Sequence, residues 1–470
     1  HFLASAHYET AMELIEEISP QLMKSRWGTL HQWLDELPAE MLFQRPGLFM
    51  MYLASLYLSG RVGQATDMYW WAASRLENEK DSLSRETLQY YEAGLNFLIA
   101  ARSFLERDFE SSVEYWEKYT ASDPEGGFIT GFGMDSNGYH PMWDISVVSA
   151  GLARSQRILR KLLQIWSGKQ NIPLVIHFMI EYGKLLYEWN RLEEAETYMQ
   201  EAWKLGKEQE ISALAFTASL WLSRIYTAMG RHYLADYYLQ AAEEWRKGSP
   251  SLSARLEWFR ALYHRMRGNS LEATAWLERC GLRPEDEIPR AMLDEYDLFA
   301  CLLAEQGREN EALTLTERLL DLARRDQLQN VMIRLTLHKS LLLQRRGLLT
   351  SSLDALEESL SLAESEGYIR TFAEEGEPAV RLLTAYLHSR QHKHRRSVKP
   401  VTLAYVKKLL QQMADERNGR KDSAENWGAE KLQVPQLTPQ EMAVLRWIAA
   451  GYSNKAIAEE LNISLSTVKT

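Results

Sequence analysis

The chain has 470 residues and a formal net charge of −10. This length exceeds one ordinary core and suits several domains or one long solenoid. The composition, with 46% hydrophobic and 25% charged residues, is that of a water-soluble protein. The negative charge argues against a protein that coats nucleic acid, so DNA contact would be confined to a local module. No apolar stretch approaches the roughly 18 residues of a membrane span.

The start of the chain and the two cysteines give further information about the class of protein. No basic region followed by an apolar one occurs at the start, so no secretory signal is expected. The chain begins with His1 in a segment of helical character, so we expect the natural protein to extend further at this end. The two cysteines, Cys280 and Cys301, offer neither a disulfide framework nor metal-site spacing. We expect both to be buried helix residues in a reducing cytoplasm.

A helix–turn–helix signature recurs along the chain and predicts the fold. It consists of an apolar segment, a turn with Gly or Asn, often Arg next, and a small residue five positions after the turn. From Asn190 onward the turns recur at nearly constant spacing, at Asn190, Gly230, Gly268, Gly307 and Gly347. Gly60 marks an earlier copy and Asp108 a degenerate one. The small residue is an alanine at positions 65, 195, 235, 273 and 312.

Each part of this signature has a physical role. Gly and Asn accept the left-handed conformation that ends a helix, and alanine lets the second helix approach the first closely. One hairpin cannot bury its apolar face alone, so the copies are expected to stack into an all-α superhelix. The repeat resembles tetratricopeptide hairpins stretched to about 40 residues. Aromatic residues at helical spacing are best explained as core, and Trp189, Trp221 and Tyr226 are weak candidates for a ligand-binding inner face.

Three segments interrupt the repeats. The glycine-rich stretch 123–140 is predicted to be a loop, either a plain insertion or a functional one. Two shorter helices are expected near 378–390 and 400–417, with the basic run 388–396 between them. This run is interpreted as a solvated connector, with phosphate contact as the alternative. The polar composition from Asp415 to Gln436 predicts a flexible linker.

The segment from Leu437 to Thr470 carries the most specific pattern. Thr438, Pro439 and Glu441 form a helix start with a capping box, and Gly451 ends that helix. Ser453 and Ser464 then cap a second and a third helix. A helix, a short turn and a second helix form the unit with which many proteins read the major groove of DNA. A generic three-helix packing motif is the alternative on pattern alone.

The residues themselves resemble the LuxR/FixJ-type helix-turn-helix. The match runs through Leu437-Thr-Pro-x-Glu, Gly451-Tyr-Ser-Asn-Lys-x-Ile-Ala and Ile463-Ser-x-Ser-Thr-Val-Lys-Thr. The resemblance implies that the chain stops inside the recognition helix, before a fourth helix used in dimerisation. It also implies DNA contacts from eight residues: Ser453, Asn454, Lys455, Ser464, Ser466, Thr467, Lys469 and Thr470.

The remainder resembles the superhelical sensor domain of the large ATP-binding LuxR regulators, the MalT-like group. The resemblance rests on Trp33-Leu-Asp-Glu-Leu-Pro, on Leu185-Leu-Tyr-Glu-Trp-Asn-Arg-Leu-Glu-Glu-Ala, and on Gly367-Tyr-Ile-Arg-x-Phe-x-x-Glu-Gly. It implies that an ATPase with a P-loop precedes the repeats in the parent protein. No G-x-x-x-x-G-K-[ST] sequence occurs in this chain, so no cofactor and no catalytic or metal-binding residue is assigned to it.

The sequence therefore predicts three parts: a repeat domain at 1–375, a helical linker at 376–436 and an incomplete helix-turn-helix at 437–470. The predicted function is transcription regulation in the bacterial cytoplasm, not enzymatic catalysis. The expected partners are promoter DNA, a small-molecule inducer or regulatory protein on the repeats, a second copy of the protein, and RNA polymerase as a further candidate. Two alternatives stay open, an interaction scaffold without a DNA role and an enzyme such as a nucleotide hydrolase.

Overall fold

The computed structural model describes residues 7–25, 27–58, 61–123, 146–168, 172–246, 249–391 and 401–429, together with residues 458 and 461. These residues form helices and turns, and no strand occurs among them. The prediction of an all-α protein is confirmed. The chain divides into two compact units, His1–Met413 and Ala414–Thr470. No helix in the described ranges is both long and apolar enough to cross a membrane.

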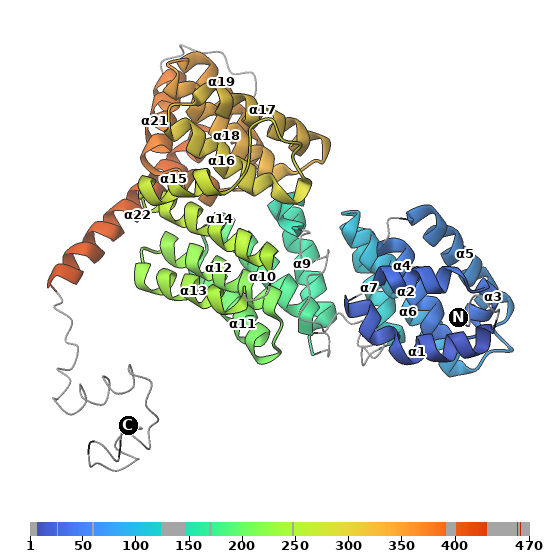
Figure 1. Cartoon of the computed structure of the whole chain (residues 1–470). Helices are drawn as coiled ribbons and strands as arrows, with labels where there is room; N and C mark the ends of the chain where they lie inside the picture. Colours follow the sequence, from blue (N-terminus) through green and yellow to red (C-terminus); the bar gives the residue numbers. More distant parts are fainter. Residues whose placement is uncertain are drawn as a thin grey trace. The chain divides into compact units, whose positions relative to one another are not determined.

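The described residues from 7 to 123 form the helices α1 to α7 (Figure 1). α4 is apolar on all sides and contacts α2, α3, α5 and α6, while α6 and α7 pair as a hairpin. Arg107 takes the left-handed φ of 65° at their turn, and Asp108 caps α7. The bounds are α1 Tyr8–Ser25, α2 Trp27–Asp35, α3 Ala39–Phe43, α4 Pro46–Leu58, α5 Val62–Asn78, α6 Arg85–Leu105 and α7 Phe109–Ser122.

Stacked helical hairpins follow, and the short 3-10 helix η2 (Val147–Ala150) and α9 (Leu152–Trp166) precede them. The first helices of successive hairpins pack on one another, as α10 does on α12 and α12 on α14 (Figure 1). The pairs are α10 Ile172–Glu188 with α11 Leu192–Glu208, α12 Ser212–Ala228 with α13 His232–Trp245, α14 Pro250–Met266 with α15 Ser270–Arg279, α16 Leu293–Glu305 with α17 Glu309–Arg325, and α18 Gln329–Arg345 with α19 Leu349–Glu364.

The predicted turns are confirmed wherever the structure describes them. Each turn residue from 190 onward has a positive φ, from 59° at Asn190 to 80° at Gly307. The predicted turn at Gly60 lies outside the described residues. The alanines five positions after the turns, at 65, 195, 235, 273 and 312, have no exposed surface. The signature therefore marks where the two helices of a hairpin meet.

One prediction that follows the repeats is confirmed and one needs correction. Helix α21 (Gly376–Gln391) forms where a helix near 378–390 was expected, and it packs on α18 and α19. Helix α22 (Leu403–Ala429) continues well past Asp415, so the flexible linker predicted from that residue is wrong as far as Ala429. The domain boundaries at 375 and 436 stay predictions. The loop at 124–140 and the basic run from 392 onward lie outside the described residues.

The two ends of the hairpin array meet. Helix η2 contacts α18, and the backbone N–H of Ala153 donates to a carboxylate oxygen of Glu366 at 2.8 Å. Glu181 of α10 is fully buried. Its carboxylate accepts from the Val147 backbone N–H of η2 at 2.8 Å and from Lys184 of α10 at 2.5 Å. Burial alone raises the pKa of Glu181, but Lys184 and the nearby His177 bring it below its usual value.

Candidate functional site

The eight residues predicted to contact DNA, from Ser453 to Thr470, lie outside the described residues. Within this segment the structure describes Ala458, which is helical and buried, and Leu461, which lies in a turn. The predicted contacts with phosphate and bases therefore stay predictions. The described residues reveal a different site, which is formed by the first helices of the hairpins and by the segment after α19.

The segment Glu366–Glu375, here called the strap, connects α19 to α21 and contains the short helix α20 (Arg370–Ala373). It lies against the end of α10. The Ile369 backbone N–H donates to the Glu188 carbonyl oxygen at 2.9 Å, and the Thr371 hydroxyl donates to the Glu188 carboxylate at 2.8 Å. The Trp189 indole N–H donates to the Glu366 carbonyl oxygen at 2.8 Å. The strap therefore joins the last hairpin to the first.

Two adjacent carboxylates of the strap pair with arginines from different hairpins. Glu374 accepts from Arg224 of α12 through two hydrogen bonds of 2.8 and 2.6 Å. Glu375 accepts from Arg265 of α14 at 2.7 Å, and Arg265 also reaches Glu305 at 3.0 Å. The side chains of Arg224 and Glu374 are only 13% and 10% exposed. These pairs are shielded from water, so each charge depends on its partner.

His338 of α18 lies between two carboxylates. Its Nδ1 is 2.6 Å from an oxygen of Asp297 on α16, and its Nε2 is 3.0 Å from an oxygen of Glu375. Arg334 donates to the second oxygen of Asp297 at 2.6 Å. The imidazole and both carboxylates are almost inaccessible to water. The strap, α16 and α18 are therefore joined through one imidazole ring.

The charges around His338 alter its pKa and that of its neighbour on the strap. Burial alone lowers the pKa of His338, but Asp297 and the other negative groups, Glu375 included, raise it well above its usual value. Burial alone raises the pKa of Glu375, yet Arg265 and His338 hold it well below its usual value. The favoured state is thus an imidazolium between two carboxylates.

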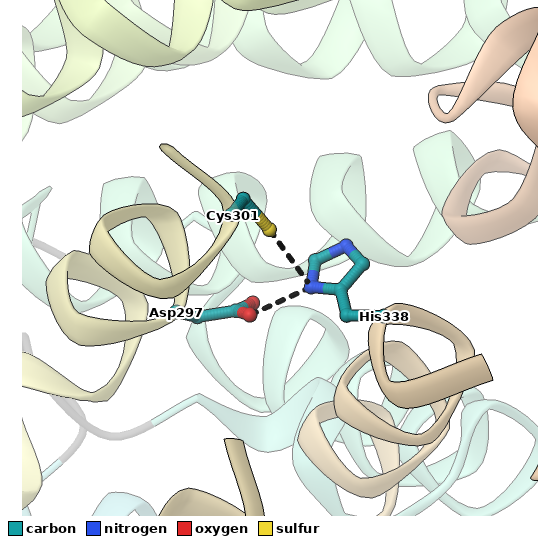
Figure 2. A group of neighbouring side chains, drawn as sticks. All are labelled: Asp297, Cys301 and His338. Atoms are coloured by element: carbon teal, nitrogen blue, oxygen red, sulfur yellow. Dashed lines mark hydrogen bonds and ion pairs between the residues drawn. The ribbon is translucent and has the colours of Figure 1, made fainter. Parts of the chain in front are cut away.

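Cys301 lies beside the same imidazole (Figure 2). Its Sγ is 3.4 Å from His338 Nδ1, and one ligand atom each from Asp297, Cys301 and His338 fit within 4.8 Å of one another. The expectation that both cysteines are buried helix residues is wrong in two respects. Both cysteines are half-buried rather than buried, and Cys280 follows the end of α15 instead of lying within it. The sequence spacing did not reveal the cluster, because His338 comes from a different hairpin.

The three aromatic candidates from the sequence have different surroundings. Trp189 donates a hydrogen bond to the strap at the Glu366 carbonyl oxygen. Trp221 packs edge-on against Tyr187, and the Arg224 guanidinium lies 4.9 Å from its ring centre. Tyr226 of α12 donates to Glu196 of the preceding hairpin at 2.7 Å and stacks on Tyr238 of its own hairpin, so it belongs to the packing between neighbouring hairpins. Sequence reasoning missed the charged residues of the site. The available signal was the presence of arginine, aspartate and histidine inside otherwise apolar first helices.

A cavity of about 580 Å³ lies elsewhere, between α14, α15 and the start of α16 with the residues just before it. Trp258, Trp276 and Leu252 line it, together with Arg255 and Glu295. Its size lies within the range of small-molecule sites, and its lining combines apolar rings with a few charges.

Stacked helical hairpins with turns at a nearly constant spacing define a tetratricopeptide-like repeat protein. The family model of the MalT-like TPR region matches residues 147–390, which is more than half of the chain. The chain therefore belongs to the family of proteins with a MalT-like TPR region. A second family model, that of the bacterial regulatory proteins of the luxR family, matches residues 435–470.

Curated relatives include the HTH-type transcriptional regulator MalT of two Yersinia species. The protein of Yersinia enterocolitica (serotype O:8 / biotype 1B) is 28% identical over 317 residues, which cover 64% of this chain and 34% of the relative. The protein of Yersinia pestis (strain Pestoides F) is 27% identical over 322 residues, with the same coverage. The chain thus spans about a third of the length of these relatives.

Two solved structures of other proteins also align with the chain. One is a Rap protein complexed with competence and sporulation factor, with a TM-score of 0.49, 12% identity, and coverage of 82% of this chain and 99% of the other. The other is NprR in complex with its cognate peptide NprX, with a TM-score of 0.32, 15% identity, and coverage of 68% and 98%.

Proposed function

We propose that the chain is the sensing and DNA-reading portion of a transcription regulator. The observation that carries this proposal is the order of its parts, in which a MalT-like repeat region at 147–390 is followed by a luxR-family segment at 435–470. The curated relatives that match over 64% of the chain are named HTH-type transcriptional regulators. Such a protein would act in the bacterial cytoplasm, where the promoter DNA is.

In this proposal the luxR-family segment contacts DNA through the eight residues from Ser453 to Thr470 predicted above. Ser464, Ser466 and Thr467 would place hydroxyls and backbone N–H groups against phosphate at the start of the recognition helix. Lys469, one turn into that helix, would reach the edges of bases. Formal charges within residues 437–470 sum to zero, with three basic and three acidic side chains. Attraction to phosphate in general is therefore weak, so binding relies on specific contacts.

The test is a titration of promoter and scrambled duplexes at several salt concentrations, using the protein encoded by the whole reading frame. Lys469→Ala should reduce discrimination between the duplexes by about 1–3 kcal/mol if the lysine reads a base. If it touches phosphate, binding to both duplexes should weaken and the salt slope should fall by about one unit. Lys118→Ala is the matched control, because this exposed lysine on α7 carries the same charge outside the motif. A protein with no preference for any promoter duplex would favour the interaction-scaffold alternative.

We further infer that the repeat region senses an inducer. The cavity next to α14 and α15 suits a small molecule with an apolar ring face and polar substituents, because Trp258 and Trp276 line it together with Arg255 and Glu295. A regulatory protein on the hairpin surface is the other candidate. A thermal-shift screen of small metabolites against the wild type and Trp276→Ala distinguishes a small-molecule inducer from a regulatory protein. A ligand that stabilises only the wild type supports the cavity.

Inducer binding would act by changing how copies of the whole protein assemble, with RNA polymerase as a further partner at the promoter. ATP handling is not assigned to residues 1–470, since these residues contain no phosphate-binding loop sequence. We propose accordingly that this chain regulates and does not catalyse. Saturable micromolar ATP binding or ATP hydrolysis by a chain of these residues would contradict this assignment.

A further inference from the structure

We propose that Asp297, Cys301 and His338 bind one divalent transition-metal ion of the Zn²⁺ class. The three side chains offer a carboxylate oxygen, a thiolate sulfur and an imidazole nitrogen, which are the ligand types of protein zinc sites. One such atom from each residue lies within 4.8 Å of the others. This site is separate from the DNA-reading segment, and the proposal does not depend on DNA binding.

The distances suit a tetrahedral ion. Zn–N and Zn–S bonds of about 2.0 and 2.3 Å place nitrogen and sulfur about 3.5 Å apart in a tetrahedral site. In the structure the Cys301 sulfur is 3.4 Å from His338 Nδ1. The Asp297 oxygen is 2.6 Å from the same nitrogen and would need to move outward by about 0.7 Å, because Zn–N and Zn–O bonds of about 2.0–2.1 Å place these atoms about 3.3 Å apart.

The fold places the three ligands on facing surfaces. Asp297 and Cys301 are four residues apart on α16, so their side chains lie on one face of the helix. His338 projects from α18, and α16 and α18 are in contact. Figure 2 shows the thiol and the carboxylate directed at the same edge of the imidazole ring. An ion at this position would link the two hairpins.

Two of the three proposed ligands, His338 and Asp297, already have a hydrogen-bond partner that orients the side chain. His338 Nε2 lies 3.0 Å from the Glu375 carboxylate, which would fix the ring with Nδ1 available to the ion. Arg334 holds the second oxygen of Asp297 at 2.6 Å and leaves the first oxygen directed toward Nδ1. This carboxylate–histidine arrangement is the usual support of a metal-binding imidazole.

The local charge also favours a cation. The ion-paired groups around the imidazole are two guanidinium groups, on Arg265 and Arg334, and four carboxylates. With the imidazolium that these charges favour, the formal sum is −1. Binding of a metal to Nδ1 requires the neutral ring, which brings the sum to −2 before the ion is added. A divalent ion offsets this excess. Sulfur and nitrogen ligands favour Zn²⁺ or Co²⁺ over Mg²⁺ or Ca²⁺. The three protein ligands leave a fourth position for water, and the half-buried Cys301 leaves an approach from solvent.

The test is a titration of the chelator-treated chain with Co²⁺, followed by displacement with Zn²⁺. We expect one equivalent to produce the near-ultraviolet band of a cobalt–thiolate bond, together with the visible bands of a four-coordinate ion. Zn²⁺ should remove both, and Mg²⁺ should remove neither. The absence of a cobalt–thiolate band in the folded wild type would overturn the proposal.

Variants identify the ligands. Cys301→Ser should abolish the thiolate band, whereas Cys280→Ser, which changes the other half-buried cysteine, should leave it intact. Glu375→Gln should weaken Co²⁺ binding about 10–100-fold while keeping the band, since this residue supports a ligand without being one. Far-ultraviolet circular dichroism checks that each variant is folded. A band that survives Cys301→Ser, or that disappears in Cys280→Ser, would show that the metal binds elsewhere.

Discussion

The pairing of the strap with α12 can be tested through Glu374. The substitution Glu374→Gln keeps the size of the side chain and removes its charge, which leaves the Arg224 guanidinium without its carboxylate. Both side chains are nearly inaccessible to solvent, at 13% and 10% exposure, and they are joined by two hydrogen bonds of 2.8 and 2.6 Å. Loss of one partner from such a pair reduces the free energy of unfolding by about 3–5 kcal/mol, because the remaining charge stays buried.

The assay is urea denaturation followed by circular dichroism, with the slope of the transition compared between variants. A double variant, Arg224→Met with Glu374→Leu, removes both charges and retains most of the volume. It should recover most of the lost stability, since replacing a buried ion pair by apolar residues is often neutral or stabilising. The Tyr187 hydroxyl, which also donates to Glu374, would then lose its acceptor, so full recovery is not expected.

The matched control is Glu194→Gln on α11. Glu194 makes the same two-bonded pair with Arg191, but these side chains are 54% and 41% exposed. Water and salt screen such a pair, so its loss should cost less than about 0.5 kcal/mol. Equal losses for Glu374→Gln and Glu194→Gln would refute the reasoning. A double variant no more stable than Glu374→Gln would refute it as well.

Three further substitutions test the hairpins themselves. Gly206→Ala should lower the free energy of unfolding by about 1–3 kcal/mol, because the added Cβ would lie 3.0 Å from the backbone nitrogen of Ala215, which thermal or urea denaturation can measure. Gln327→Gly should raise it by up to about 1 kcal/mol in the same assay, since Gln327 has a left-handed φ of 53° that strains a side chain. Glu181 has a pKa below its usual value, so its contribution to stability is present above the usual pKa and is lost as the pH falls through the lowered one. Glu181→Gln should therefore flatten the loss of stability on acidification, and an unchanged pH profile would contradict this role.

The parts of the fold that could be predicted depend on local chemistry. Asn190 and Gly230 end their helices because they accept a left-handed backbone, and the alanines five residues later are buried because two helices touch there. The turns between one hairpin and the next were not predicted. Two of them, after α11 and after α17, use Glu210 and Gln327 at φ values of 55° and 53°, and neither residue type signals that conformation. Tertiary packing imposes it at a cost of about 1–2 kcal/mol per residue.

The candidate site could not be predicted, because its contacts join residues far apart in the sequence. Glu374 and Arg224 are 150 residues apart, and Ala153 and Glu366 are 213 residues apart. The similarity at Gly367-Tyr-Ile-Arg identified the strap as a family feature but gave no partner for its carboxylates. The partner of each depends on how far the hairpin array turns before its ends meet, and that turn is the sum of small rotations between successive hairpins. His338 and Glu375 are 37 residues apart, on the last hairpin and the strap that follows it, so their contact is local to that end of the array. The pair of Glu374 with Arg224, by contrast, forms only because the array brings its two ends together.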